Sequence, residues 1–286
     1  MRVLLTGSMG QLGRCFSDRF PTDWSLLALD SKQLDICDSD AIEQAVTEFE
    51  PDVIVNAAAY TAVDKAESEP DVAKAINTYG PGYLAAAAAA RNIPFVHVST
   101  DYVFDGRSEE PYCEDAPCSP QNIYGKTKLE GEIAALKANP KTIVIRTAWV
   151  FSEYGNNFVK TMLRVGSQRG ELGVVSDQQG CPTYAGDLAD AIISMLQEPG
   201  EYGVYHFCGD SMVSWYEFAQ IIFQQATESG LYPHQVIVNP ITTQEYPTPA
   251  SRPVYSVLNT DKICALNLKP SAWRQQLHAV IRKLLQ

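Results

Sequence analysis

The sequence predicts an α/β fold in which a doubly wound parallel sheet carries a smaller second lobe. Over the first 150 residues, short runs rich in Val, Ile and Leu alternate with longer amphipathic stretches. Strands that are buried on both faces and connected by helices have this pattern. A glycine-rich turn directly follows the first of these runs. Because such a turn brings backbone amides to the carboxyl edge of a parallel sheet, the two observations together predict a Rossmann-type sheet.

The expected elements follow from these runs in chain order. The strands are predicted at 2–6, 25–29, 52–56, 95–99 and 142–145. Between them, a helix is expected at 38–50 with Asp40 as its cap, and a long Ala-rich helical segment at 64–91 with a break at 80–82. After Trp149 the pattern loosens. Helices are expected at 157–167, 187–197, 214–230 and 271–285, a strand at 203–208, and a Pro-rich loop at 240–253.

Composition excludes several classes of partner. The chain has 286 residues, with 22 Lys and Arg against 34 Asp and Glu, which gives a formal net charge of −12. Neither nucleic acid nor an anionic membrane surface attracts such a protein. The seven cysteines are scattered without a C-x-x-C pair, and reduced thiols of this kind are typical of the cytoplasm. No apolar stretch is long enough to span a membrane and no leader is evident, so we expect a cytoplasmic protein.

The glycine-rich turn is the first sign of chemistry. Gly7, Gly10 and Gly13 lie between the first expected strand and a helix, where backbone amides and the helix N-terminus can hold a diphosphate. Asp30 ends the second strand, where a carboxylate can accept both hydroxyls of an adenosine ribose and repels a 2′-phosphate. NADH is therefore favoured over NADPH, although Lys32 would soften that preference. The alternative is a tight strand-to-helix turn with no ligand.

A second signal is a tyrosine and a lysine spaced for cooperation on a helix. Tyr124 and Lys128 are four residues apart, so they share one helical face. A nearby cation lowers the pKa of a phenol toward neutral pH, which lets it serve as a proton donor. Thr100, at the end of the fourth strand, can reach the same carbonyl. The alternative reading of Tyr124 and Lys128 as ordinary surface residues is disfavoured by their position after this strand.

These features occur in the order found in the extended short-chain dehydrogenase/reductase family. The chain resembles this family and, within it, the dTDP-4-dehydrorhamnose reductases. The resemblance covers nearly the whole chain and is carried by the segments 51–67, 99–104, 124–128, 146–150 and 246–253. It implies a domain organisation in which residues 1–150, completed by parts of 181–210, bind NAD(P), and residues 151–286 form mainly the substrate-binding lobe. The substrate cleft is expected at the seam between the two.

The resemblance also implies a mechanism and a set of binding residues. Hydride from NADH or NADPH would reduce the keto carbon of dTDP-4-dehydro-L-rhamnose, with Tyr124 as proton donor and Lys128 and Thr100 assisting it. The residues expected to bind the cofactor are Gly7, Gly10, Gln11, Leu12, Gly13, Asp30, Asp35, Ile36, Ala57, Ala58, Ala59, Tyr60, Thr61, Tyr124 and Lys128. A cofactor-binding role for Asp35 and Ile36 is no better supported than the alternative, in which Asp35 is an ordinary loop acid and Ile36 a core side chain.

The substrate is expected to contact Val63, Thr100, Asp101, Val103, Trp149, Asn157 and Arg252. The indole of Trp149 suits a half-apolar deoxysugar, although a plain core tryptophan at the end of the fifth strand is the alternative. The guanidinium of Arg252 matches the diphosphate of the dTDP group, although it also reads as a surface arginine. Lys160 is a further candidate beside Asn157.

No metal is predicted. Some relatives form a magnesium-bridged dimer through acidic residues, but Cys15 stands at one of those positions. The histidines lack zinc spacing, and His97 and His206 read as structural. A homodimer remains open. Two other functions also remain open: a reductase or epimerase that forms another dTDP-deoxysugar, and a non-catalytic regulatory subunit of the methionine adenosyltransferase type.

Overall fold

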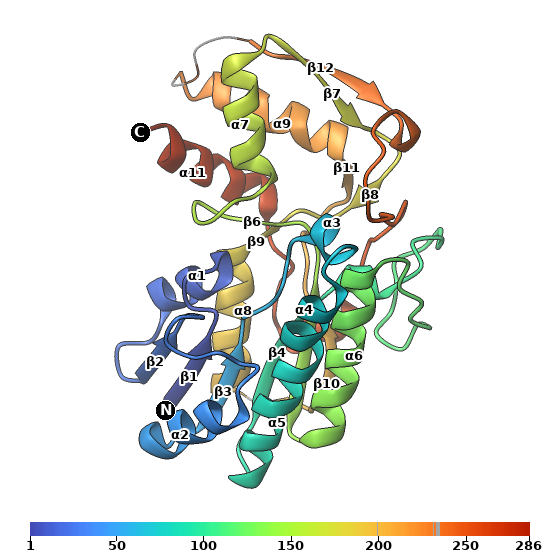
Figure 1. Ribbon diagram of the computed structural model, residues 1–286. Helices are drawn as coiled ribbons and strands as arrows, with labels where there is room; N and C mark the ends of the chain where they lie inside the picture. The colour runs from blue at the N-terminus through green and yellow to red at the C-terminus, as the bar shows by residue number, and fades with distance from the viewer. Residues whose placement is uncertain (199, 231, 233–234) are drawn as a thin grey trace.

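The centre of the molecule is a six-stranded parallel sheet (Figure 1). The computed structural model describes residues 1–198, 200–230, 232 and 235–286, so His234 lies outside the described residues. The strand order is β10-β5-β4-β3-β1-β2. Their bounds are Arg2–Thr6 for β1, Ser25–Leu29 for β2, Val53–Asn56 for β3, Phe95–Thr100 for β4, Thr142–Thr147 for β5 and Gly203–His206 for β10. The order reverses between β1 and β3, which places a crevice beyond their carboxyl ends.

Helices cover both faces of this sheet because successive strand residues point to opposite sides. Val3 and Leu5 pack with α1 (Gln11–Arg19) and α8 (Ala185–Gln197), whereas Leu4 packs on the other face with α2 (Ser39–Phe49) and α5 (Gly80–Ala90). Next to α5 lies α6 (Ile123–Ala138), the helix that carries Tyr124 and Lys128. The predicted fold class is confirmed.

The second lobe has a core of its own, above the carboxyl edge of the sheet in Figure 1. It is built from α7 (Phe158–Gln168), α9 (Trp215–Glu228) and α11 (Trp273–Leu285), which pack with the parallel pair β7 (Glu171–Val175) and β12 (Ile237–Ile241). Shorter elements connect the lobes: β6 (Val150–Phe151) with β9 (Thr183–Tyr184), β8 (Gln179–Gly180) with β11 (Val213–Ser214), and α10 (Asp261–Cys264).

Three local predictions were wrong. The cap of α2 is Asp38, whose side chain accepts hydrogen bonds from the amides of Asp40 and Ala41. The Ala-rich segment is not broken at Gly80. It begins as α3 (Val63–Ala66), resumes with α4 (Pro70–Lys74), and continues into α5 through the π-helical turn η1 (Ala75–Tyr79). A wider turn before Pro81 suits a residue that has no N–H to donate.

The third correction concerns the Pro-rich stretch, which is not all loop. Strand β12 includes Pro240, and a 3₁₀ turn, η3, follows at Thr243–Glu245. A proline is tolerated here because, within the described residues, β12 pairs with β7 alone, so its other edge needs no N–H donor. Across the described residues, no helix combines the length and apolar character needed to cross a membrane.

Candidate active site

A cavity of about 740 Å³ opens at the crevice beyond β1 and β3. It is lined by all of the residues expected to bind the cofactor except Gly13: Gly7, Gly10, Gln11, Leu12, Asp30, Asp35, Ile36, Ala57, Ala58, Ala59, Tyr60, Thr61, Tyr124 and Lys128. These residues come from the ends of β1, β2 and β3 and from the start of α6. The fold therefore places the two motifs found in the sequence, the glycine turn and the pair Tyr124 and Lys128, at the same cavity.

The glycine turn is held by backbone-to-backbone contacts that side chains would prevent. Gly7 has a φ of +72°, and a Cβ at this position would lie 2.5 Å from the amide nitrogen of Ala58. At Gly13, a Cβ would lie 2.3 Å from the carbonyl oxygen of Gly7. Gly13 thus serves helix packing rather than the cavity wall. Gly10 caps α1 without a side-chain hydrogen bond, which leaves that helix end suited to an anion.

Other groups in the cavity wall fit a dinucleotide. The Oδ1 atom of Asp30 accepts hydrogen bonds from the amides of Lys32 and Gln33, at 2.9 and 3.1 Å, which fixes the carboxylate at the end of β2. The hydroxyl of Thr147 lies in the cavity wall, is buried, and has no hydrogen-bond partner within the described part of the protein. A buried polar group of this kind is best satisfied by a ligand.

Tyr124 and Lys128 share one face of α6, whose first turn is capped by Asn122. Burial raises the pKa of Tyr124 to about 12, while a hydrogen bond with Thr100 opposes that shift. Burial lowers the pKa of Lys128 to about 8, against the effect of Glu132. The Lys128 Nζ atom donates to the carbonyl of Val98 at 2.7 Å. The predicted lowering of the Tyr124 pKa by Lys128 stays a prediction.

Thr100 and Asp101 lie where β4 ends, beside Tyr124. The Thr100 hydroxyl donates to Oδ1 of Asp101 at 2.9 Å. Burial raises the pKa of Asp101 to about 6, so this carboxyl changes its charge at mildly acidic pH. Val103, predicted beside them, is fully buried in a core cluster. A substrate contact through its side chain would require that cluster to open.

Trp149 lies in the connection two residues beyond β5, whereas the alternative interpretation of the sequence placed it at the end of that strand. It has a φ of +48°, an unusual backbone conformation for a bulky residue. Its ring stacks on Trp215 of α9, with 3.4 Å between centroids. A Cβ at Gly180 would lie 2.5 Å from the indole. The indole is therefore held against the second lobe, and the cavity wall is formed by its chain neighbours Thr147 and Val150.

The other predicted substrate residues are engaged by the protein. Arg252 forms a two-point ion pair with Asp64 in α3, whose first residue is Val63. Asn157 caps α7 through Oδ1, and its Nδ2 donates to Oε1 of Gln11 at 2.8 Å. Asn157 thus ties the second lobe to the glycine turn. The substrate roles of these residues stay predictions.

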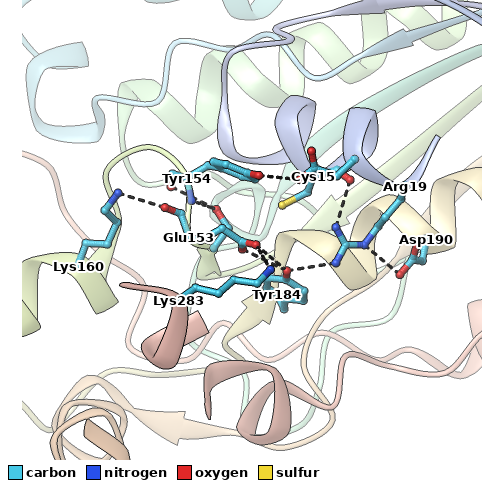
Figure 2. A network of polar contacts seen from close by, with 10 residues as sticks. Cys15, Arg19, Glu153, Tyr154, Lys160, Tyr184, Asp190 and Lys283 are labelled. Carbon is cyan, nitrogen blue, oxygen red and sulfur yellow. Dashed lines mark hydrogen bonds and ion pairs between the residues drawn. The ribbon is translucent and has the colours of Figure 1, made fainter. Parts of the chain in front are cut away.

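A polar network beside α1 joins the two lobes (Figure 2). Arg19 donates to Tyr184 at 3.1 Å and to Asp190 at 3.3 Å. Tyr184 in turn donates to Glu153, which also pairs with Lys283 of α11 at 2.6 Å.

Cys15, the residue that argued against a metal bridge, is buried on α1 within this same region, and burial raises its pKa to about 12. Such a thiol stays protonated and is a poor metal ligand. The described residues include no group of three or more His, Cys, Asp or Glu side chains placed to hold a metal ion.

Sequence reasoning missed several residues around the site. Asp64 was part of a recognised segment, but nothing in the sequence pairs it with Arg252, 188 positions away. Glu132 lies one turn beyond Lys128 and forms a buried ion pair with Arg146. Four-residue spacing from Lys128 is the one signal that could have pointed to it.

Comparison with known proteins places the chain in a family. Residues 1–286 match the RmlD substrate binding domain family. A dTDP-4-dehydrorhamnose reductase of Aggregatibacter actinomycetemcomitans is 46% identical, over 96% of this chain and 97% of that protein. The chain belongs to the dTDP-4-dehydrorhamnose reductase family. Its resemblance to that family, recognised from the motifs, is thereby confirmed.

Solved structures of the family share the whole architecture. A dTDP-4-dehydrorhamnose reductase from Clostridium acetobutylicum superposes with a TM-score of 0.94, at 42% identity and with both chains fully covered. The same enzyme from Bacillus anthracis, solved in complex with NADP, has a TM-score of 0.92 at 37% identity, with 99% of each chain covered.

Proposed function

We propose that this protein reduces the keto group of dTDP-4-dehydro-L-rhamnose to give dTDP-L-rhamnose, using NADH or NADPH. The observation that carries the proposal is the meeting of Tyr124, Lys128 and the glycine turn at one cavity. Thr100, the last residue of β4, lies beside Tyr124. The named activity of the relatives supports the substrate.

The nicotinamide cofactor supplies the hydride when bound, and the protein's own residues supply the rest. Tyr124 gives its proton to the oxygen of the reduced carbonyl. With a pKa raised to about 12 by burial, the phenol carries its proton at neutral pH, and positive charge beside it must lower that pKa for the proton to be given up readily. Thr100 orients that phenol, and Lys128 provides positive charge to stabilise the phenolate that remains. The sugar would lie between Thr100 and the indole of Trp149.

Cofactor choice rests on Asp30. Its carboxylate, fixed at the end of β2, is suited to the two hydroxyls of an adenosine ribose, which supports NADH. The relative from Bacillus anthracis was solved with NADP, which supports NADPH. We propose that both are used and that Asp30 favours NADH. An Asp30→Ser substitution is expected to move the preference toward NADPH.

The test is loss of NADH or NADPH absorbance when the purified protein meets dTDP-4-dehydro-L-rhamnose, with the product identified by chromatography. Tyr124→Phe should lower turnover by about 10²–10⁴-fold, the usual worth of a positioned proton donor. The matched control is Tyr102→Phe, because Tyr102 contacts Tyr124 edge-on, with ring centroids 5.5 Å apart, yet holds no role in the proposed mechanism. Turnover that survives in Tyr124→Phe would rule out this proton donor.

The same assay separates the other functions. Reduction of a different dTDP-ketosugar, or a product of opposite configuration at the carbinol carbon, would replace the proposed substrate while keeping the reductase. Binding of the cofactor without turnover of any ketosugar would favour the regulatory-subunit reading.

A further inference from the structure

Thr147 ends β5 with a hydroxyl that lacks a hydrogen-bond partner. The residue is 5% exposed, and its Oγ1 atom forms no hydrogen bond with any of the described residues. Thr142, at the other end of the same strand, shows the usual arrangement, since its buried hydroxyl donates to the carbonyl oxygens of Ala135 and Asn139. A buried hydroxyl without a partner is unfavourable, so it calls for a partner from outside the chain.

The sheet directs Thr147 toward the cofactor cavity. Because successive strand residues alternate between the two faces, Thr147 lies on the same face as Ile145, which packs in one core cluster with α8. Thr147 lines the cavity on this side together with Val98 of β4, Val150 of β6 and Leu188 of α8. Apolar side chains thus accompany the threonine in the cavity wall, and they suit the face of an aromatic ring.

Thr147 lies at the end of the cavity where Tyr124 is found. The register of the sheet pairs Thr147 with Thr100, so their backbones are about 5 Å apart, and Thr100 lies beside Tyr124. Asp30, which we propose for the adenosine ribose, follows β2 at the opposite edge of the sheet, and the glycine turn follows β1 between them. A dinucleotide with its adenosine at Asp30 therefore extends its nicotinamide toward Thr147.

The other polar side chains at this end of the cavity are already engaged. Ser99 donates its hydroxyl hydrogen to Glu132, and Nζ of Lys128 donates to a backbone carbonyl oxygen of β4. Tyr124 is needed as proton donor in the proposed function. Within the described part of the cavity wall, the hydroxyl of Thr147 is therefore the polar group at this end that is still available to a ligand.

We propose that the hydroxyl of Thr147 hydrogen-bonds to the carboxamide group of the nicotinamide ring and thereby orients the ring for hydride transfer. The inference rests on the proposed function, because it requires a nicotinamide cofactor in this cavity. A hydroxyl can donate and accept, and so can a carboxamide, so the two groups are complementary. Because the carboxamide projects from one edge of the ring, holding it restricts rotation of the ring and selects the face that is turned toward the ketone.

The test compares the binding of NADH with that of ADP-ribose, which lacks the nicotinamide ring. The Kd of each is measured by isothermal titration calorimetry for the unaltered protein and for Thr147→Val, without ketosugar. We expect Thr147→Val to raise the Kd of NADH by about 2–10-fold, the usual effect of losing one neutral hydrogen bond, and to leave the Kd of ADP-ribose unchanged. Equal changes for the two ligands, or no change for NADH, would overturn the proposal.

Two further variants serve as controls. Thr147→Ser keeps the hydroxyl and should bind NADH as the unaltered protein does. A Kd as high as that of Thr147→Val would show that the methyl group matters instead, and would overturn the proposal. Thr142→Val removes a buried hydroxyl from the same strand but outside the cavity wall, so it should leave the Kd of both ligands unchanged. A loss of NADH affinity as large as that in Thr147→Val would also contradict the proposal.

The Tm of the free protein gives an independent readout. Thr142→Val loses hydrogen bonds and should lower the Tm, whereas Thr147→Val removes a hydroxyl without a partner and should leave the Tm unchanged or raise it. An equal fall in both variants would show that the Thr147 hydroxyl already has a partner inside the protein, which would overturn the proposal.

Neither measurement depends on turnover, so the two proposals can fail separately. Selective weakening of NADH in Thr147→Val, in a protein that reduces no ketosugar, would contradict the proposed function alone. Reduction of the sugar by a protein whose Thr147→Val variant binds NADH normally would contradict the role of Thr147 alone.

Discussion

The Arg252 guanidinium donates two hydrogen bonds to the Asp64 carboxylate, at 2.9 and 2.7 Å. This pair connects the loop before the last elements of the chain to α3, the short helix beyond β3. Burial raises the pKa of Tyr102, and the charge of nearby Arg252 opposes that rise. Tyr102 in turn contacts Tyr124. Tyr102 therefore links the guanidinium to the proposed proton donor, and the Asp64 carboxylate holds the group that we propose for the diphosphate.

Replacing Arg252 should weaken binding of the nucleotide sugar and leave the cofactor unaffected. Arg252→Gln removes a two-point match to phosphate, so we expect KM for the sugar to rise about tenfold or more, since a charged hydrogen bond contributes about 1.5–3 kcal/mol. The cofactor Kd, measured by quenching of protein fluorescence, should stay the same. Arg164→Gln, at an exposed position on α7, is the control. An unchanged KM in Arg252→Gln would remove this residue from the substrate site.

A substitution that leaves Trp149 in place but displaces its ring would test the sugar-binding role. At Gly180, a new Cβ would lie 2.5 Å from the indole, so Gly180→Ala must push Trp149 away from its stack on Trp215. We expect a higher KM for the sugar and a changed tryptophan fluorescence, with cofactor binding preserved.

Gly170→Ala is the matched control, because a Cβ there meets nothing within 4 Å. Should both alanine variants bind the sugar equally well, while the fluorescence of Gly180→Ala shows that the indole has moved, Trp149 is not part of the sugar site.

The sequence predicted the sheet and the cofactor cavity well because both depend on local patterns. Apolar runs set the strands, and the three glycines set a turn whose ligand-binding geometry is built into the backbone. The ion pair between Arg252 and Asp64 could not be predicted from the sequence, because it depends on how the second lobe folds back over the first. The left-handed backbone of Trp149 and its stack on Trp215 could not be predicted either. The stack depends on a contact between distant segments of the chain, which a periodic sequence pattern does not indicate.

The buried ion pair beside Lys128 should matter strongly for stability. Arg146 donates to Glu132 from Nη2 at 2.8 Å and from Nε at 3.1 Å, with side chains 5% and 2% exposed. Glu132→Gln leaves a buried guanidinium without its counter-charge, so we expect a loss of about 3–5 kcal/mol in the free energy of unfolding. Urea denaturation measures it.

Two further variants test whether burial causes the loss of stability in Glu132→Gln. Glu43→Gln breaks the more exposed pair with Arg91 and should cost about 1 kcal/mol or less. The double variant Glu132→Leu with Arg146→Met removes both charges and should recover much of the loss, because no unpaired charge stays buried. Equal costs for Glu132→Gln and Glu43→Gln would contradict the argument from burial.

The burial of His206 should make the free energy of unfolding depend on pH. Its Nδ1 lies 3.2 Å from the carbonyl oxygen of Asn259, an acceptor, so the neutral ring carries its proton there. Burial and the neighbouring Arg146 lower the pKa of His206 to about 3. An unfolded histidine has a pKa of about 6.5. Between these values the unfolded chain binds more protons than the folded one, so the stabilising contribution of neutral His206 is fully present above about 6.5 and falls as the pH drops.

We therefore expect His206→Asn, which retains a donor near Nδ1, to flatten the acid side of the stability profile. The free energy of unfolding of the unaltered protein should fall between pH 6.5 and 4 more steeply than that of the variant, by a difference of up to about 1.4 kcal/mol per pH unit. Asp101 acts in the opposite direction, because its raised pKa of about 6 makes the folded state bind the extra proton in this range. Asp101→Asn should therefore steepen the same acid loss, and parallel profiles for all three proteins would show that neither buried group titrates as the structure indicates.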